Sequence, residues 1–127
     1  MPKKILIVDD EIHIRVLLEQ MLEDFKAAGV EILSACDGLE AWNVVRREQP
    51  QIVILDVMMP NLSGYEVCQR IKNDPILSHA HVIMLTAKGQ RADRQRSVAV
   101  GANEYITKPF DPNYVIDRIS NILGISV

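Results

Sequence analysis

The chain has 127 residues, 48% of them hydrophobic and 24% charged, which suits one domain over residues 1–127. Its longest aliphatic or methionine runs are four residues, far below the roughly 20 that span a bilayer, so we expect no membrane segment. Fourteen Lys and Arg against seventeen Asp and Glu give a net charge of −3, which argues against binding nucleic acid mainly through phosphates. Because the N-terminus does not resemble a signal peptide, we expect a cytoplasmic protein. The two cysteines, Cys36 and Cys68, lie 32 residues apart without a Cys-x-x-Cys pair, and we expect both to be buried or half-buried free thiols.

In chain order, the first predicted element is a strand at residues 5–8, a short apolar run of the kind buried on both faces of a sheet. Apolar residues then recur at helical spacing across residues 12–25, which predicts the first helix. Residues 30–35 only partly alternate between apolar and polar side chains, which predicts a second strand at a sheet edge. Helical spacing returns across residues 39–45.

Two further apolar runs, at residues 52–55 and 82–85, predict the third and fourth strands, with a helix across residues 67–71 between them. A weakly amphipathic helix around residues 90–97, a short strand at 104–106 and a helix across 115–123 complete the chain. This alternation predicts an α/β fold with five parallel strands and five helices on both faces. With the second and fifth strands at the edges, the doubly wound order is 2-1-3-4-5.

Polar side chains follow four of these strands, at the edge where sheets of this order bind ligands: Asp9 and Asp10, Asp56, Thr86 and Lys108. A single aspartate after a strand most often caps a helix or forms a turn. Five polar residues at the same edge of one sheet are much harder to explain in that way. Carboxylates about 4 Å apart repel by roughly 4 kcal/mol at an effective dielectric near 20, so the cluster needs a cation.

The ligand types at this edge indicate which cation it would hold. Oxygen ligands without His or Cys favour Mg²⁺, with Mn²⁺ also possible. Lys108 and Thr86 suit the oxygens of a phosphoryl group held on an aspartate. The sequence therefore predicts phosphoryl transfer onto a carboxylate.

Three stretches resemble the receiver domain of two-component response regulators: IVDDE at residues 7–11, DVMMP at 56–60 and GANEYITKPF at 101–110. They occur in the expected order on the expected elements, and Gly64 and the Thr86-Ala87 pair also match. The resemblance covers nearly the whole chain and implies the flavodoxin-like fold of that family.

The resemblance also implies the metal and acceptor roles. Asp56 would accept the phosphoryl group and contribute to the Mg²⁺ site. Asp10 would bind the ion directly, Asp9 through water, and the backbone carbonyl of Met58 would be a further ligand.

The remaining implied roles concern the phosphoryl oxygens and the conformational switch. Thr86 and Lys108 would contact the phosphoryl oxygens, and Thr86 and Tyr105 would form the switch. The Lys108-Pro109 bond resembles one that is cis in the family. Met58 and Lys88 flank the approach of water to the acceptor in the family, and because neither side chain can activate water, we expect slow autodephosphorylation.

The expected partners follow from the same resemblance. A sensor histidine kinase or a phosphotransfer protein would donate the phosphoryl group, and the domain would be a switch rather than an enzyme with an external substrate. Output would pass through the helix at 90–97, the strand at 104–106 and the helix at 115–123, to a protein target or a second copy, without direct nucleic-acid binding. Some charged residues resemble the dimer face of the winged-helix subfamily (Asp93, Arg94, Glu104 and Arg118), whereas Asn103 and Tyr114 replace acidic residues there.

Four other kinds of protein share part of this pattern. An FMN carrier of the same strand order needs a Ser/Thr/Gly-rich phosphate loop where this chain has Asp9, Asp10 and Glu11. A phosphohydrolase of the haloacid dehalogenase type needs a second Asp where this chain has Met58. A degenerate receiver, which signals without phosphate, would lack the acceptor aspartate, a member of the acid pair, the threonine or the lysine, and this chain has all of them. A receiver excised from a DNA-binding transcriptional regulator stays open, although a complete chain of this length would have to act by protein contact.

Overall fold

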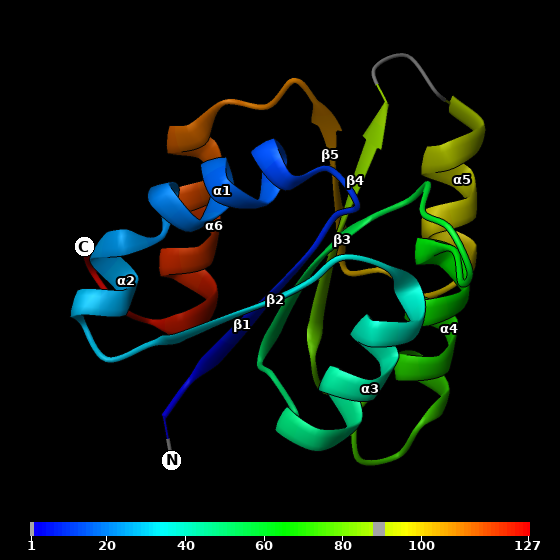
Figure 1. Cartoon of the computed structure of the whole chain (residues 1–127), viewed down its shortest axis with the longest axis horizontal. Helices are drawn as coiled ribbons and strands as arrows, with labels where there is room; N and C mark the ends of the chain where they lie inside the picture. The colour runs from blue at the N-terminus through cyan, green and yellow to red at the C-terminus, as the bar shows by residue number, and fades with distance from the viewer. Residues whose placement is uncertain (1, 88–90) are drawn as a thin grey trace.

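The structure, a computed structural model, describes residues 2–87 and 91–127, with the side chains of residues 87 and 91–93 outside the description. Five parallel strands form one sheet in the order β2-β1-β3-β4-β5 (Figure 1). The strands are β1 (Lys4–Val8), β2 (Glu31–Ala35), β3 (Ile52–Asp56), β4 (His81–Ala87) and β5 (Glu104–Lys108). The predicted fold class and strand order are confirmed, with β2 and β5 at the edges.

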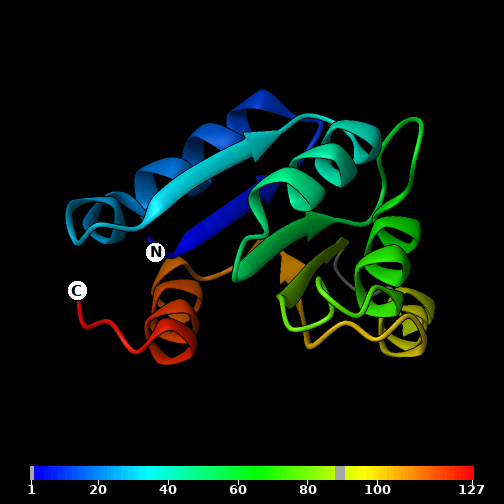
Figure 2. The same ribbon diagram turned by 90° about the horizontal axis from the view of Figure 1, so that it is seen from below.

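Helices cover both faces of this sheet, as Figures 1 and 2 show. On one face lie α1 (Ile12–Met21), α2 (Glu23–Ala27) and α6 (Pro112–Leu123). On the other lie α3 (Gly38–Glu48), α4 (Gly64–Asn73) and α5 (Arg91–Ala99). The sheet therefore separates two apolar cores, as expected of a doubly wound protein.

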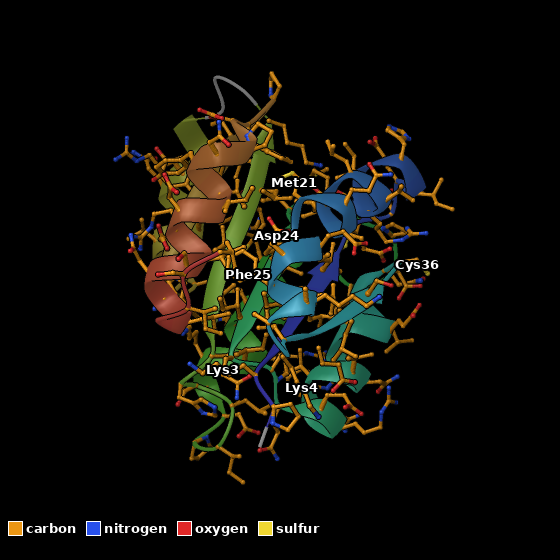
Figure 3. All side chains as sticks on the ribbon, turned by 90° about the vertical axis from the view of Figure 1, so that its left-hand side faces the viewer. Lys3, Lys4, Met21, Asp24, Phe25 and Cys36 are labelled. Atoms are coloured by element: carbon orange, nitrogen blue, oxygen red, sulfur yellow. The ribbon has the colours of Figure 1, made fainter. Side chains whose placement is uncertain are left out.

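The central strands are buried on both faces because their side chains alternate between the two cores. Ile5 and Ile7 of β1 join the cluster that contains Phe25, whereas Leu6 and Val8 join the cluster under α3 and α4. Phe25, labelled in Figure 3, has no exposed surface. This two-sided burial explains why the central strands are continuous apolar runs rather than alternating ones.

The described residues form six helices, so the prediction of five was wrong. The helical spacing across residues 12–25 continues through a break at Leu22, where φ is −98° and ψ is 9°. There the N–H of Leu22 is shared between the carbonyls of Leu18 and Glu19, which tightens the last turn of α1 and separates it from α2. Leu18, Leu22 and Phe25 remain in one core, so the apolar pattern does not register the break.

Two smaller predictions also need correction. β5 continues two residues beyond its predicted end, because Thr107 and Lys108 pair with Thr86 and Ala87 of β4. Cys36, predicted to be buried or half-buried, is exposed just after the edge strand β2 (Figure 3), whereas Cys68 is buried; both are free thiols. Within the described parts of the chain, no helix has the length and apolar character needed to cross a membrane.

Candidate functional site

The parallel sheet brings four strand ends to one edge. Asp9 directly follows β1, and Asp56 is the last residue of β3. Thr86 lies one residue before the end of β4, and Lys108 is the last residue of β5. Because β1 pairs with β3, β3 with β4 and β4 with β5, these strand ends lie beside one another at the carboxyl edge.

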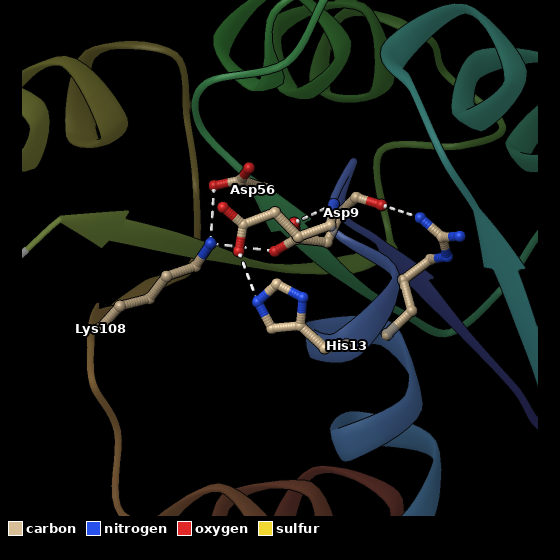
Figure 4. Close-up of polar contacts among 6 residues, drawn as sticks. Asp9, His13, Asp56 and Lys108 are labelled. Atoms are coloured by element: carbon tan, nitrogen blue, oxygen red, sulfur yellow. Dashed lines mark hydrogen bonds and ion pairs between the residues drawn. The ribbon is translucent and has the colours of Figure 1, made fainter.

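A lysine lies between two of the carboxylates, as Figure 4 shows. Nζ of Lys108 is 2.9 Å from Oδ2 of Asp9 and 3.2 Å from Oδ1 of Asp56. The Asp9 side chain has no exposed surface and Asp56 is 8% exposed, whereas Asp10 is exposed at the rim. The buried charges are therefore paired, which lowers the cost of burying them.

The donor set fits a hard divalent cation. Asp9, Asp10 and Asp56 each offer one carboxylate oxygen, and these oxygens lie within 4.8 Å of one another. Within the described part of the chain, the other comparable group is Cys36, Asp37 and Glu40, which follows the edge strand β2 and mixes a thiol with two carboxylates. Three carboxylate oxygens without nitrogen or sulfur are ligands that suit Mg²⁺ or Mn²⁺.

Backbone contacts hold the acidic residues in place. Oδ1 of Asp9 accepts a hydrogen bond from the N–H of Glu11 at 2.9 Å, and the Asp9 carbonyl accepts one from Nη1 of Arg15 at 2.7 Å. Gly64 packs against the Asp56 backbone so closely that a Cβ atom there would lie 2.1 Å from the Asp56 carbonyl oxygen. Only glycine permits this approach, which explains the glycine eight residues after Asp56.

The surroundings shift the two central ionisable groups in the same direction. Burial, followed by the charge of Asp9, raises the pKa of Asp56 from its ordinary 3.8 to about 6, against the opposing effect of Lys108. Burial acts to lower the pKa of Lys108, but the hydrogen bonds and charges of Asp9 and Asp56 outweigh it, so that pKa is raised. At neutral pH the Asp56 carboxylate is therefore mostly ionised and paired with a charged lysine, although its charge is costly.

Asp56→Asn should stabilise the metal-free protein at pH 7.5, by about 1 to 3 kcal/mol. Because the folded-state pKa of Asp56 is raised to about 6, its contribution to stability is greatest below pH 3.8 and is lost as the pH rises through 6. The gain in the free energy of unfolding of the variant over the wild-type protein should therefore shrink toward zero near pH 4. Urea unfolding of both proteins in EDTA across this pH range measures the difference, and a gain that does not depend on pH would contradict the account.

The remaining predicted site residues lie on β4, on β5 and just after β3. Thr86 is buried, Tyr105 is half-buried with the Arg94 guanidinium 5.0 Å from its ring centroid, and Met58 is 74% exposed. The Lys108-Pro109 peptide bond is cis. Lys88 and the side chain of Asp93 lie outside the described residues.

A cleft of about 550 Å³ opens beside the carboxylates, between α1 and the loop that follows β5. Its acidic end includes Asp10 and Asp56, and its apolar wall includes Ile14, Leu17 and Phe110. The site is therefore an open acidic pocket with an apolar flank rather than a closed cavity.

Sequence reasoning did not predict two sets of contacts that the structure shows. Arg15 contacts the Asp9 carbonyl, and the only sequence signal is a basic residue six positions after Asp9, too common a feature to use. Away from the site, Glu104 accepts hydrogen bonds from Arg118 at 2.7 and 3.0 Å and lies 2.6 Å from Nε2 of His81. That network joins β4, β5 and α6, and only the tertiary structure brings it together.

The doubly wound sheet and the acidic cluster at its switch point define a flavodoxin-like α/β protein whose carboxylates have the donor chemistry that suits a hard cation. The chain belongs to the response regulator receiver domain family, whose sequence profile matches residues 5–120.

Relatives and solved structures agree with this assignment. The chain is 46% identical over 121 residues to the probable transcriptional regulator ycf27 of Cyanophora paradoxa, covering 95% of this chain and 48% of the relative. It is similar to the crystal structure of a putative response regulator from Chloroflexus aurantiacus, with a TM-score of 0.87, 35% identity and coverage of 98% and 99%. It is also similar to the receiver domain of the sensor histidine kinase PA1611 from Pseudomonas aeruginosa, described with a magnesium ion coordinated in its active-site cleft (TM-score 0.84, 25% identity, coverage 98% and 99%). The chain spans about half the length of the curated relatives it matches.

Proposed function

We propose that the chain is a cytoplasmic phosphorylation switch in which Asp56 accepts a phosphoryl group from a phosphohistidine of a sensor kinase or phosphotransfer protein. The observation that carries the proposal is the convergence of Lys108 on Asp56 and Asp9, beside a third carboxylate, at the switch point of the sheet. No external substrate is turned over: the P–N bond of the donor breaks as the bond from an Asp56 oxygen to phosphorus forms.

The residues of the site divide the work of this transfer. Asp56 supplies the nucleophilic oxygen, which is mostly ionised at neutral pH with a pKa of about 6. Lys108, 3.2 Å from Asp56 Oδ1, balances the charge of the transferred phosphoryl oxygens, and Thr86 supplies a hydroxyl from the neighbouring strand. Asp9, Asp10, Asp56 and the Met58 carbonyl would hold Mg²⁺, which neutralises negative charge on the acids and the phosphoryl group. The magnesium-bearing receiver domain of PA1611 supports this choice of ion.

The apolar flank of the cleft supports a protein donor. Leu17, which lines the cleft, is 41% exposed, and the same helix α1 also exposes Ile12 (67%) and Val16 (44%). Exposed aliphatic side chains gathered beside a charged pocket are typical of a protein contact surface. The donor protein would bury them while its phosphohistidine enters the pocket.

The output surface we propose is formed by α5, β5 and α6, with Thr86 and Tyr105 as the switch. Among the described side chains of α5, only Ser97 is buried, so the helix is held to the sheet by little apolar surface. Arg118 is already paired with Glu104 within the chain. Phosphorylation would change which side chains this surface offers to a protein target or a second copy.

A second candidate is that this receiver controls a longer DNA-binding transcriptional regulator. It is favoured by relatives of about twice this length that are described as transcriptional regulators, among them the phosphate regulon protein PhoB of Pseudomonas aeruginosa. The length of the native reading frame discriminates between the two candidates.

Acetyl phosphate with Mg²⁺ should add one phosphoryl group to the protein, as measured by intact mass. Asp56→Asn should abolish this addition, because the nucleophilic oxygen is replaced by an amide. Asp24→Asn, a matched change at an exposed residue of α2, should label as the parent does (Figure 3). Undiminished labelling of Asp56→Asn would refute the proposed acceptor.

Met58→Asn should shorten the lifetime of the phosphorylated protein, by a factor of about ten or more. Met58 is 74% exposed beside the acceptor, and its thioether cannot orient an attacking water, whereas an amide can accept and donate hydrogen bonds. Combining it with Lys88→Glu should accelerate the loss further. Phosphoprotein decay in Mg²⁺ buffer measures both variants, and decay of the double variant at the parental rate or slower would oppose this explanation.

A further inference from the structure

The peptide group between Asp9 and Asp10 is held by a side chain from α1. β1 ends at Val8, so the Asp9 carbonyl lies beyond the last strand residue. Its hydrogen bond comes from Nη1 of the half-buried Arg15, at 2.7 Å. A short bond from a charged donor is among the stronger hydrogen bonds in proteins.

The planarity of the peptide group makes this contact important for the metal site. The Asp9 carbonyl oxygen lies in the same plane as the N–H of Asp10, because rotation about the peptide C–N bond that joins the two residues is strongly hindered. Holding the oxygen therefore fixes the orientation of the whole peptide group. That orientation decides how the side chains of Asp9 and Asp10 are directed relative to each other.

The other contacts of Asp9 act on its side chain. Oδ1 accepts a hydrogen bond from the Glu11 N–H at 2.9 Å, and Oδ2 lies 2.9 Å from Nζ of Lys108. These contacts orient the Asp9 carboxylate, whereas among the residues that the structure describes none forms a hydrogen bond or ion pair with the exposed Asp10 side chain. Because neighbouring carboxylates repel, an unrestrained pair would separate in the absence of a cation.

We propose that Arg15 is a positioning residue for the divalent-cation site: its hydrogen bond to the Asp9 carbonyl keeps the Asp9 and Asp10 carboxylates directed at one ion. This inference rests on the proposed Mg²⁺-dependent phosphoryl acceptance. Arg15 contacts neither the ion nor the phosphoryl group, so it acts on affinity for the cation and not on the transfer itself. It lowers the cost of assembling the site before the cation arrives.

The test measures Mg²⁺ affinity, phosphoryl uptake and metal-free stability in matched variants. Arg15→Gln, whose shorter neutral side chain loses the contact, should weaken Mg²⁺ binding by about tenfold, the low end of effects seen when residues supporting metal ligands are changed. Arg47→Gln is the control: it removes the same charge from an exposed arginine of α3 that pairs with Glu48, and its Mg²⁺ affinity should match wild type. With acetyl phosphate at saturating Mg²⁺, uptake by Arg15→Gln should return close to the wild-type rate.

Arg15→Lys provides a second variant should Arg15→Gln fail to fold in EDTA, and it should bind Mg²⁺ more weakly than wild type. Equal affinities for the Arg15 variants and Arg47→Gln would overturn the inference, as would uptake that stays slow at saturating Mg²⁺. In either case wild-type binding and labelling would leave the proposed function intact. Wild-type protein that binds no Mg²⁺ would instead defeat the proposed function, and the role of Arg15 with it.

Discussion

Asp10→Asn should weaken Mg²⁺ binding by about tenfold or more, a loss of at least about 1.4 kcal/mol. Asp10 contributes one of three carboxylate oxygens that lie within 4.8 Å of one another, and it is the exposed one. Replacing it with an amide removes a full negative charge from the ligand set while preserving the shape of the side chain. Calorimetric titration with Mg²⁺ measures the change in affinity.

Glu11→Gln is the matched control for this experiment, since it removes the same charge one residue further along. Glu11 precedes the first turn of α1, and its side chain lies 3.4 Å from Nε2 of the exposed His13. We therefore expect a smaller loss of affinity than in Asp10→Asn. A loss in Glu11→Gln equal to or greater than that in Asp10→Asn would show that the direct ligand is misassigned.

Beryllofluoride, which mimics a phosphoryl group on Asp56, should shift amide resonances from Thr86 to Phe110 more than those of α3. α5 is the element that can respond, because it is rich in polar residues and Ser97 is its only buried side chain among those described. α3, in contrast, is anchored by the buried residues Ala41, Val44 and Val45. The mimic changes the distribution of conformations only by its different affinity for them.

Thr86→Ala tests whether the switch runs through the buried threonine. The variant retains Asp56 and the three carboxylates, so it should still bind beryllofluoride, but shifts beyond the acidic pocket should be greatly reduced. Changes confined to the pocket in the wild-type protein would show that Thr86 and Tyr105 do not couple the site to α5, β5 and α6.

The sheet order was predictable because burial on two faces makes the central strands continuous apolar runs. Residues 52–55 and 82–85 have this character, whereas β2 and β5 expose part of their surface, as edge strands do. Once the order is known, the chain places Asp9, Asp56, Thr86 and Lys108 at one edge without further information. Those positions come from topology, which hydrophobic patterning reports well.

What could not be predicted depends on local backbone geometry or on contacts between distant segments. The break at Leu22 leaves the apolar face unchanged, so periodicity cannot reveal it. The end of β5 is polar and therefore resembles a loop, although Thr107 and Lys108 pair with β4. The hydrogen bond from Arg15 to Asp9 depends on the angle at which α1 leaves the sheet, which no short motif encodes.

The most direct test of the central claim is to locate the phosphoryl group on the chain. Sodium borohydride reduces an aspartyl phosphate to homoserine, which marks the modified position permanently. After treatment with acetyl phosphate and Mg²⁺, peptide mass spectrometry should find homoserine at position 56, and the mark should be absent when Mg²⁺ is removed with EDTA. Homoserine at position 9 or 10, or none anywhere in a folded protein that binds Mg²⁺, would contradict the assignment of Asp56 as the acceptor.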